Sequence, residues 1–249
     1  MSAIFALANQ KGGVAKTTTT GILAAGLKKQ GFSVLTIDCD PQGNLSMSVA
    51  ADNQSGATMY EVMKRTVSAR DAVQHTDSCD IIPANTILAG IEQELHQVGK
   101  EMTLREALRD EENGVAQNYD YILIDCPPSL GLLTVNALTA ADGVIIPVAA
   151  EFFALRGVAL LMQSIEKVQS RINPSLEVYG VLVTMYTRTL HCEEVLQRIY
   201  EAFQGKVFHS VISRSIKLPD STVAAAPITI YAPNHKTAKE YREVARELI

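Results

Sequence analysis

Residues 9–20 read Asn-Gln-Lys-Gly-Gly-Val-Ala-Lys-Thr-Thr-Thr-Thr, and this stretch decides the fold. It follows an apolar run over residues 4–8 that is typical of a buried strand, and it leads into a helical pattern over residues 17–30. A glycine-rich turn between a strand and a helix is the setting of a phosphate-binding loop, because backbone N–H groups and the helix N-terminus there surround anionic oxygens. In such a loop Lys16 reaches the β and γ phosphates, and the Thr17 hydroxyl ligates magnesium. The stretch therefore predicts a nucleotide-binding α/β protein.

The stretch departs twice from the strict phosphate-loop pattern, which would place glycine at the positions of Gln10 and Ala15. What remains is Lys-Gly-Gly-x-x-Lys-Thr, in which Gly12 and Gly13 still allow a close backbone approach and a second lysine, Lys11, precedes them. The methyl group of Ala15 is tolerated if its backbone has helical dihedrals. A glycine-rich turn that merely starts an ordinary helix is disfavoured, because strand, loop, Lys-Thr pair and helix occur together.

Apolar β-branched runs and helical patterns alternate along the rest of the chain. We predict strands over residues 4–8, 33–38, 121–125, 144–148, 178–184 and 207–212. We predict helices over residues 17–30, 86–98, 103–110, 131–140, 155–171, 193–203 and 236–249. This order predicts an α/β fold with a doubly wound, mostly parallel sheet that carries helices on both faces. We see no internal repeat or linker, so we expect residues 1–249 to form a single domain.

Composition and charge exclude several classes of protein. With 47% hydrophobic and 20% charged residues among 249, the chain is expected to fold around a sizeable core. Its net charge of -5 is too acidic for a protein that coats nucleic acid by bulk charge, so any contact with DNA needs a local basic patch. The four cysteines stand singly without a C-x-x-C pair, which disfavours a zinc or iron–sulfur site and fits a reducing cytoplasm. No run near 20 apolar residues and no export signal occur, so we expect no membrane span.

Two further segments place carboxylates where predicted parallel strands end. Residues 36–44 read Thr-Ile-Asp-Cys-Asp-Pro-Gln-Gly-Asn, and residues 121–129 read Tyr-Ile-Leu-Ile-Asp-Cys-Pro-Pro-Ser. Ligands bind at this edge of open α/β sheets. Together with the loop, these segments resemble switch I and the Walker B and switch II region of the deviant Walker A ATPases of the ParA/MinD family. The resemblance runs through essentially the whole chain, and residues 181–189 and 207–218 resemble the ParA (Soj-like) partition branch.

The resemblance implies a set of site residues. It assigns nucleotide binding to Lys11, Gly12, Gly13, Val14, Ala15, Lys16, Thr17, Thr18, Met185 and Ser213, the last two beside the base. It implies that Asp40 orients the attacking water, that Lys16 stabilises the γ-phosphate charge, and that Lys11 reaches across a nucleotide-sandwich dimer to the partner's phosphates. It gives Thr17, Asp40 and Asp125 to Mg²⁺, and Arg188, Arg214 and Lys217 to DNA. Relatives usually carry proline where Ser213 stands, and Asp38 is expected to be a supporting or switch contact.

The function that the resemblance implies is an ATP-dependent partition switch. ATP and Mg²⁺ would drive a homodimer that binds DNA nonspecifically, and hydrolysis stimulated by a ParB-type centromere-binding partner would release it. Such a switch segregates chromosome or plasmid DNA, so we expect a cytoplasmic, nucleoid-associated protein. Because the loop begins about ten residues into the chain, we expect no N-terminal helix-turn-helix.

Alternatives of different classes remain open. A MinD-like membrane-positioning ATPase needs a C-terminal amphipathic helix with a basic face. Residues 236–249 instead carry Tyr241, Val244, Ala245 and Leu248 at core-helix spacing with charges of both signs opposite them, which predicts a docked helix. A ParA-like ATPase that positions a protein cargo would share the same motifs. An iron–sulfur carrier is disfavoured by the cysteine spacing, and a non-enzymatic scaffold is opposed by Lys11, Lys16, Thr17 and Asp40.

Overall fold

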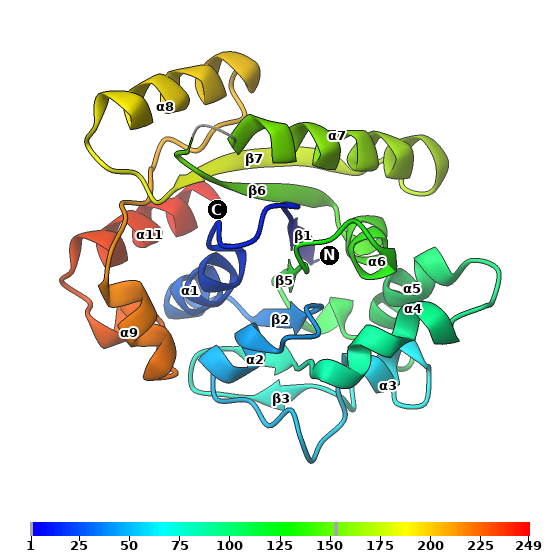
Figure 1. Ribbon diagram of the computed structural model, residues 1–249. Coiled ribbons are helices and arrows are strands. Elements are labelled where there is room, and N and C mark those ends of the chain that lie inside the picture. The colour runs from blue at the N-terminus through cyan, green and yellow to red at the C-terminus, as the bar shows by residue number, and fades with distance from the viewer. Residues whose placement is uncertain (1, 152–153) are drawn as a thin grey trace.

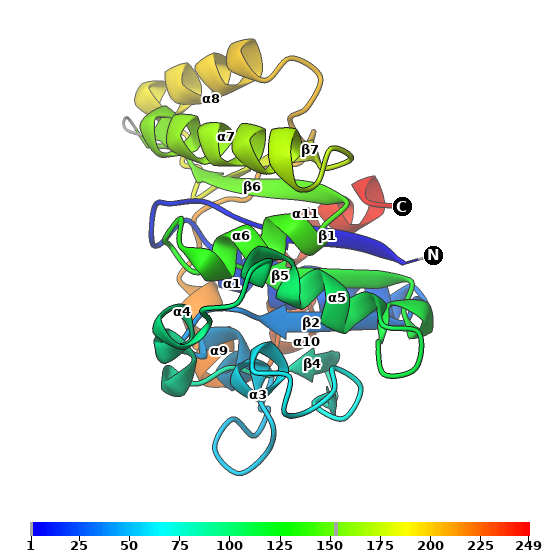
Figure 2. The ribbon, with the colours of Figure 1, turned by 90° about the vertical axis from the view of Figure 1, so that its right-hand side faces the viewer.

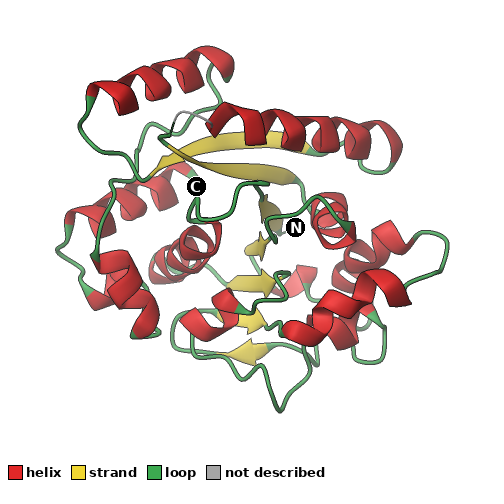
Figure 3. Ribbon diagram, in the orientation of Figure 1, coloured by secondary structure: helices red, strands yellow, loops and turns green. Residues whose placement is uncertain are grey.

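The computed structural model describes residues 2–151 and 154–249. A seven-stranded sheet runs through the molecule in the order β3-β4-β2-β5-β1-β6-β7 (Figure 1, Figure 3). The strands are β1 (Ala3–Leu7), β2 (Val34–Asp38), β3 (Gln74–His75), β4 (Asp80–Ile82), β5 (Tyr121–Asp125), β6 (Gly143–Ala149) and β7 (Glu177–Thr184). Neighbouring strands are parallel except for β3 and β4. The predicted doubly wound, mostly parallel α/β sheet is confirmed.

Helices cover both faces of this sheet. They are α1 (Lys16–Lys29), α2 (Asn44–Ser48), α3 (Met59–Met63), α4 (Ile91–Glu94), α5 (Thr103–Arg109), α6 (Leu132–Ala140), α7 (Ala154–Arg171), α8 (Leu190–Ala202), α9 (Lys217–Val223), α10 (Ile228–Tyr231) and α11 (Lys236–Glu247). Three 3-10 turns complete them, η1 (Thr86–Gly90), η2 (Lys100–Met102) and η3 (Ala116–Asn118). Figure 1 shows α1 and α11 on one side of the strands and α5 and α6 on the other, and Figure 2 shows α7 and α8 beyond β6 and β7.

The alternation of side chains along the strands divides the core into two clusters. Ile4 and Ala6 of β1 belong to the cluster that is completed by α5, α6 and α7. Phe5 and Leu7 belong to the cluster that is completed by α1 and α11. Because both faces are covered, the central strands read as continuous apolar runs. Their parallel direction brings the chain segments that follow β1, β2 and β5 to one edge of the sheet.

The predicted strand over residues 207–212 is wrong. This segment pairs with the β7 region only through isolated bridges, Val181 to Val207 and Tyr186 to Ser213. Between the bridges, the backbone N–H groups of His209 and Ser210 donate to the Glu247 carboxylate of α11, at 2.8 and 2.9 Å. These backbone N–H groups therefore bind the Glu247 side chain, and a continuous strand does not form between the two bridges.

The predicted helix over residues 86–98 is also wrong, because it divides into η1 and α4 and gives way to extended backbone at Leu95. Apolar side chains at helical spacing indicated a helix here, but the helical backbone ends after Glu94, before the predicted end of the helix. The predicted helix over residues 193–203 exists and begins three residues earlier, because Thr189 caps it by accepting from the Cys192 N–H. The elements that the sequence did not predict, β3, β4, α2, α3, α9 and α10, are all short.

Candidate functional site

A cavity of about 730 Å³ opens at the edge of the sheet where the parallel strands end. Its size is that of ligand pockets in general. It is lined by Gly12, Gly13, Ala15, Lys16, Thr17 and Thr18 of the loop and α1, by Asp40, Gln42, Asn44, Ser48 and Pro128, and by Thr184, Met185 and several residues between 212 and 223. The structure therefore brings most of the predicted nucleotide-binding residues, together with Asp40, around one space.

The loop reaches this cavity through two residues with left-handed backbone, Gly13 at φ 72° and Ala15 at φ 66°. The condition set for Ala15, helical dihedrals, is not met, because α1 begins only at Lys16. A left-handed conformation costs a residue with a side chain about 1–2 kcal/mol. Ala15 thus holds a strained conformation at the position where the strict phosphate-loop pattern has glycine. Val14 is buried, and its carbonyl accepts from the Thr184 hydroxyl at 3.1 Å, which ties the loop to β7.

Lys16 supplies the positive charge inside the cavity. The side chain is nearly buried, and its ammonium donates to the Lys11 carbonyl at 3.3 Å. Burial lowers the pKa of Lys16, whereas the nearby charge of Asp125 opposes that shift. A cation held within its own loop, among backbone N–H groups, is arranged to receive anionic phosphate oxygens.

Asp125 lies fully buried beneath the loop, at the end of β5. Its Oδ1 accepts from the Thr20 hydroxyl at 3.5 Å, and its Oδ2 has no hydrogen-bond partner among the described residues. Burial raises the pKa of Asp125 well above its usual range, and the Asp38 charge adds to this, whereas the nearby polar side chain of Thr17 and the Lys16 charge oppose it. A buried carboxylate with a free oxygen beside a threonine hydroxyl fits a hard divalent cation such as Mg²⁺.

The Mg²⁺ site is incomplete without the phosphate oxygens of a bound nucleotide. Within residues 2–151 and 154–249, no group of three His, Cys, Asp or Glu side chains is arranged to hold a metal ion. Mg²⁺ commonly binds through one or two carboxylates together with substrate phosphates. Thr17, Asp40 and Asp125 are thus suited to hold Mg²⁺ with a nucleotide, and not as a cage of their own.

Asp38, the last residue of β2, and Asp40, two residues later, have different roles. Asp38 uses both oxygens, since Oδ2 accepts from the Ser46 N–H and hydroxyl at 2.9 and 2.7 Å and Oδ1 accepts from the Asp40 N–H. Burial raises the pKa of Asp38 to about 6. Asp40 lines the cavity, and among the described residues its carboxylate is bonded only by the Gln42 N–H, at 3.0 Å. Asp38 therefore fastens α2 to the sheet, and Asp40 is the carboxylate that faces a ligand.

Lys11 is not among the residues that line the cavity. Its ammonium forms an ion pair with Glu151, which follows β6. Asn9 fixes the backbone here, because its Oδ1 accepts from the Lys11 N–H at 3.0 Å and its Nδ2 donates to the Pro147 carbonyl at 2.7 Å. Asn9 and Glu151 had no predicted role. The position of Asn9 at the head of the loop was a signal for it, whereas nothing in the sequence pairs Glu151 with Lys11.

Met185 and Ser213 line the cavity on its β7 side. Met185 has φ 53°, an uncommon conformation for a long side chain. Ser213 donates its N–H and its hydroxyl to the two oxygens of Glu240, at 2.8 and 2.6 Å. A proline at this position would have no N–H to donate. The departure at Ser213 is therefore matched by a partner in α11, Glu240, which the sequence did not predict.

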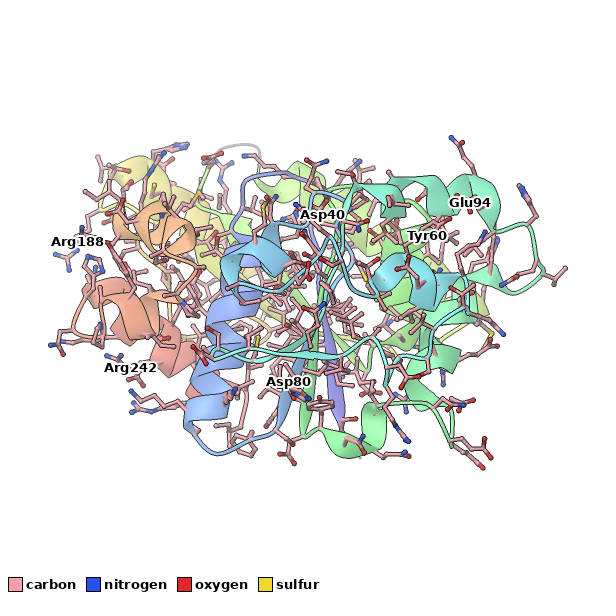
Figure 4. The ribbon with its side chains drawn as sticks, turned by 90° about the horizontal axis from the view of Figure 1, so that it is seen from below. Asp40, Tyr60, Asp80, Glu94, Arg188 and Arg242 are labelled. Atoms are coloured by element: carbon pink, nitrogen blue, oxygen red, sulfur yellow. The ribbon has the colours of Figure 1, made fainter. Side chains whose placement is uncertain are left out.

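The predicted DNA-binding residues lie close to this side of the cavity but differ in their surroundings. Arg188 is exposed and has no ion-pair partner in the part of the chain that the structure describes. Arg214 lines the cavity, and its N–H donates to the Tyr186 carbonyl. Lys217 forms an ion pair with Asp220 at 3.0 Å. Figure 4 shows Arg188 at the end of the molecule opposite Glu94. The predicted patch is therefore weakened by one internal ion pair.

The C-terminal helix is docked, as its spacing predicted. Tyr241, Val244 and Ala245 of α11 are buried against α1, and the Tyr241 hydroxyl lies 3.0 Å from that of Thr19. A membrane-lying helix would need this apolar face for lipid. None of the helices in the described part of the chain has the length and hydropathy that a membrane crossing requires.

Comparison with known proteins agrees with this geometry. Residues 2–178 match the family described as AAA domain. Sporulation initiation inhibitor protein Soj of Bacillus subtilis is 40% identical over 253 residues, which cover 100% of this chain and 98% of Soj. Chromosome partitioning protein ParA of Caulobacter vibrioides is 41% identical over 252 residues, which cover 99% of this chain and 93% of that protein.

A solved structure extends the comparison to the cavity. The crystal structure of cobyrinic acid a,c-diamide synthase from Mycobacterium smegmatis with bound ATP analogue and magnesium has a TM-score of 0.86 and 38% identity to this chain. The match covers 100% of this chain and 94% of that one. A protein with the same fold therefore binds the two ligands for which the loop, Asp125 and Thr17 are suited here.

Proposed function

The chain belongs to the AAA-domain family of Soj and ParA ATPases, and we propose that its ATP-bound dimer binds DNA without sequence preference and partitions chromosomes or plasmids. The chain is an ATPase that uses ATP with Mg²⁺, and its relatives include a chromosome partitioning protein ParA and a chromosome-partitioning ATPase Soj. What we propose beyond this is the role of each residue, the dimer, the DNA contact and a ParB-type partner that stimulates hydrolysis.

The cavity supports a division of labour in phosphoryl transfer. Backbone N–H groups from Gly12 to Thr18 and the Lys16 ammonium bind the phosphates and stabilise the charge that spreads over the γ-phosphate oxygens. Thr17, Asp40 and Asp125 hold Mg²⁺, which neutralises phosphate charge when bound. Asp40 orients the attacking water, because it lines the cavity and one of its carboxylate oxygens has no hydrogen-bond partner among the described residues.

One observation carries the dimer proposal: the loop has two lysines, and only one of them lines the cavity. Lys16 lies inside and Lys11 lies outside, paired with Glu151. A cation beside a phosphate site that it does not enter can serve the site of a second copy, as an arginine finger does in trans. The Lys11–Glu151 pair is partly exposed to solvent, with side chains 35% and 52% exposed, so its ions separate at small cost in free energy.

The DNA proposal rests on Arg188 and Arg214. The segments that carry them are joined by the bridge between Tyr186 and Ser213, next to the nucleotide cavity. One subunit offers few cations, and pairing two subunits through ATP doubles the number of phosphates that can be neutralised. Because the C-terminal apolar face is buried against α1, DNA is favoured over a membrane surface as the partner. We propose a single-domain, cytoplasmic, nucleoid-associated protein.

The test measures whether the ATP-bound and the ADP-bound protein bind DNA or anionic vesicles. The full chain with ATP and Mg²⁺ is expected to bind random-sequence DNA and to sediment as a dimer, whereas with ADP it is expected to do neither. DNA affinity should fall with salt at a log-log slope of about -0.9 for each phosphate neutralised. An ATP dimer that ignored DNA but bound anionic vesicles would replace this proposal with the MinD-like one. If the dimer bound neither surface, the remaining candidate function would be the positioning of a protein cargo.

A further inference from the structure

The β7 side of the cavity contains a network of three side chains from two distant segments. The Ser213 hydroxyl donates to Glu240 Oε1 at 2.6 Å, and the Ser213 N–H donates to Glu240 Oε2 at 2.8 Å. The Lys236 ammonium donates to the Ser213 hydroxyl oxygen at 2.8 Å and lies 3.4 Å from Glu240. Of the three residues, only Ser213 lines the cavity. Glu240 and Lys236 of α11 therefore act on the cavity through Ser213.

The network fixes the hydrogen-bonding character of the Ser213 hydroxyl. A serine hydroxyl has one proton and two acceptor lone pairs. The carboxylate takes the proton and Lys236 takes one lone pair, so the oxygen has a single acceptor position left. The bond to an ionised carboxylate is charge-assisted, which holds the hydroxyl proton away from the cavity more firmly than a neutral partner would. On its cavity side Ser213 can thus accept a hydrogen bond but cannot donate one.

A nucleotide whose phosphates lie in the loop would extend toward this acceptor. Apolar lining residues on this side, Met185, Leu218, Pro219 and Val223, suit the faces of an aromatic base, and they stand beside the polar lining residues Arg214, Ser215 and Thr222. We propose that the Ser213 hydroxyl accepts a hydrogen bond from the exocyclic amino group of the nucleobase, so that the Ser213–Glu240–Lys236 network selects amino-bearing bases such as adenine. The inference rests on the proposed placement of the nucleotide in this cavity.

The chain contains a matched control for the network. Glu247 lies two turns after Glu240 in α11 and also binds this segment through both carboxylate oxygens, which accept from the backbone N–H groups of His209 and Ser210. Neither His209 nor Ser210 lines the cavity. Loss of Glu247 therefore measures only the effect of a weaker contact between this segment and α11. Loss of Glu240 weakens that contact too, and it also changes the Ser213 hydroxyl that faces the base.

The experiment compares two nucleotides that differ by one amino group. The full chain with Mg²⁺ is titrated in a calorimeter with the β,γ-imido form of ATP and with that of its 6-desamino counterpart, purine riboside triphosphate. A hydrogen bond of this kind predicts that the wild type binds the adenine nucleotide about five- to tenfold more tightly. Ser213→Ala should reduce that ratio to within about twofold while leaving the affinity for the desamino nucleotide unchanged.

Three further variants separate the possible failures. Ser213→Thr keeps a hydroxyl and should keep the ratio, Glu240→Gln should lower it, and Glu247→Gln should leave it as in the wild type. If Ser213→Ala kept the wild-type ratio, the inference would be overturned and the proposed function would stand. If Lys16→Ala bound both nucleotides as tightly as the wild type, the nucleotide would lie elsewhere, and both proposals would fall.

Discussion

The two sides of the nucleotide cavity are built in opposite ways. On the phosphate side, one continuous stretch, residues 9–20, supplies the backbone turn, Lys16 and Thr17. On the β7 side, Met185, Ser213 and Glu240 come from three segments that meet only in the folded chain. The first side can be recognised from the order of its residues, whereas the second depends on tertiary contacts. Substitutions on the two sides should therefore differ in both size and kind of effect.

The largest effect is expected for Asp40→Ala, on the phosphate side. The variant should still bind ATP with Mg²⁺, because the phosphate-binding loop, Thr17 and Asp125 stay intact. It should lose at least about 100-fold in kcat, because the water-orienting carboxylate is removed. Asp52→Ala is the matched control. Asp52 accepts from the N–H of Gln54, two residues on, as Asp40 accepts from Gln42, but it is exposed and does not line the cavity. Steady-state hydrolysis measures both variants, and equal rates for Asp40→Ala and the wild type would remove Asp40 from the chemistry.

Lys11→Ala tests whether the phosphate side is completed by a second copy. It should leave ATP binding by the monomer within about twofold and weaken the ATP-bound dimer at least about tenfold, because Lys11 does not line its own cavity. Glu151→Gln removes the partner of Lys11 and leaves the lysine, so its dimer should persist. Sedimentation with ATP in the Asp40→Ala background gives the readout. A Lys11→Ala dimer as stable as the control's would assign the lysine a role within one subunit.

The central fold was predictable because its signals are local. Strands β1, β2, β5, β6 and β7 and the helices α1, α6, α7 and α11 follow apolar runs and periodic patterns that any stretch of the chain displays by itself. The loop and the aspartates at the strand ends were predictable for the same reason. Parallel strands bring their carboxyl ends to one edge, so residues 38–40 and 125 had to gather near residue 16.

The remainder was not predictable because it depends on partners distant in the sequence. Segment 207–212 has the composition of a strand, and only Glu247 of α11 explains why its N–H groups leave the ladder. Ser213 looked like an unexplained departure until Glu240 supplied its partner. Likewise, the ion pair of Lys11 could not be predicted, because its partner, Glu151, lies far along the chain.

Beyond the cavity on its β7 side, the cations near Ser213 should differ in their contribution to DNA binding. Arg188→Ala should weaken DNA binding by the ATP dimer severalfold and reduce the salt slope by about 0.9 for each phosphate that is no longer neutralised. Lys217→Ala should have a smaller effect, because its ammonium is already paired with Asp220. Asp220→Asn should then increase affinity by freeing Lys217. Binding isotherms at several salt concentrations separate these variants, and equal reductions in affinity for Arg188→Ala and Lys217→Ala would mean that the Asp220 pair opens on DNA.

The smallest effect concerns the stability of the loop. Ala15→Gly should stabilise the fold by about 0.5–1 kcal/mol, because glycine adopts φ 66° without the steric cost that alanine carries. Glycine also makes the unfolded chain more flexible, and this offsets only part of the gain. In a chain of 249 residues this corresponds to a rise in Tm of about 1–4 °C. Ala25→Gly, in the interior of α1, should instead destabilise by about 1 kcal/mol, because a helical backbone favours alanine. Thermal unfolding of both variants gives the sign directly. A lower Tm for Ala15→Gly would show that the methyl group contributes more through its packing than its left-handed backbone costs, and the phosphate side would then depend on tertiary contacts as the β7 side does.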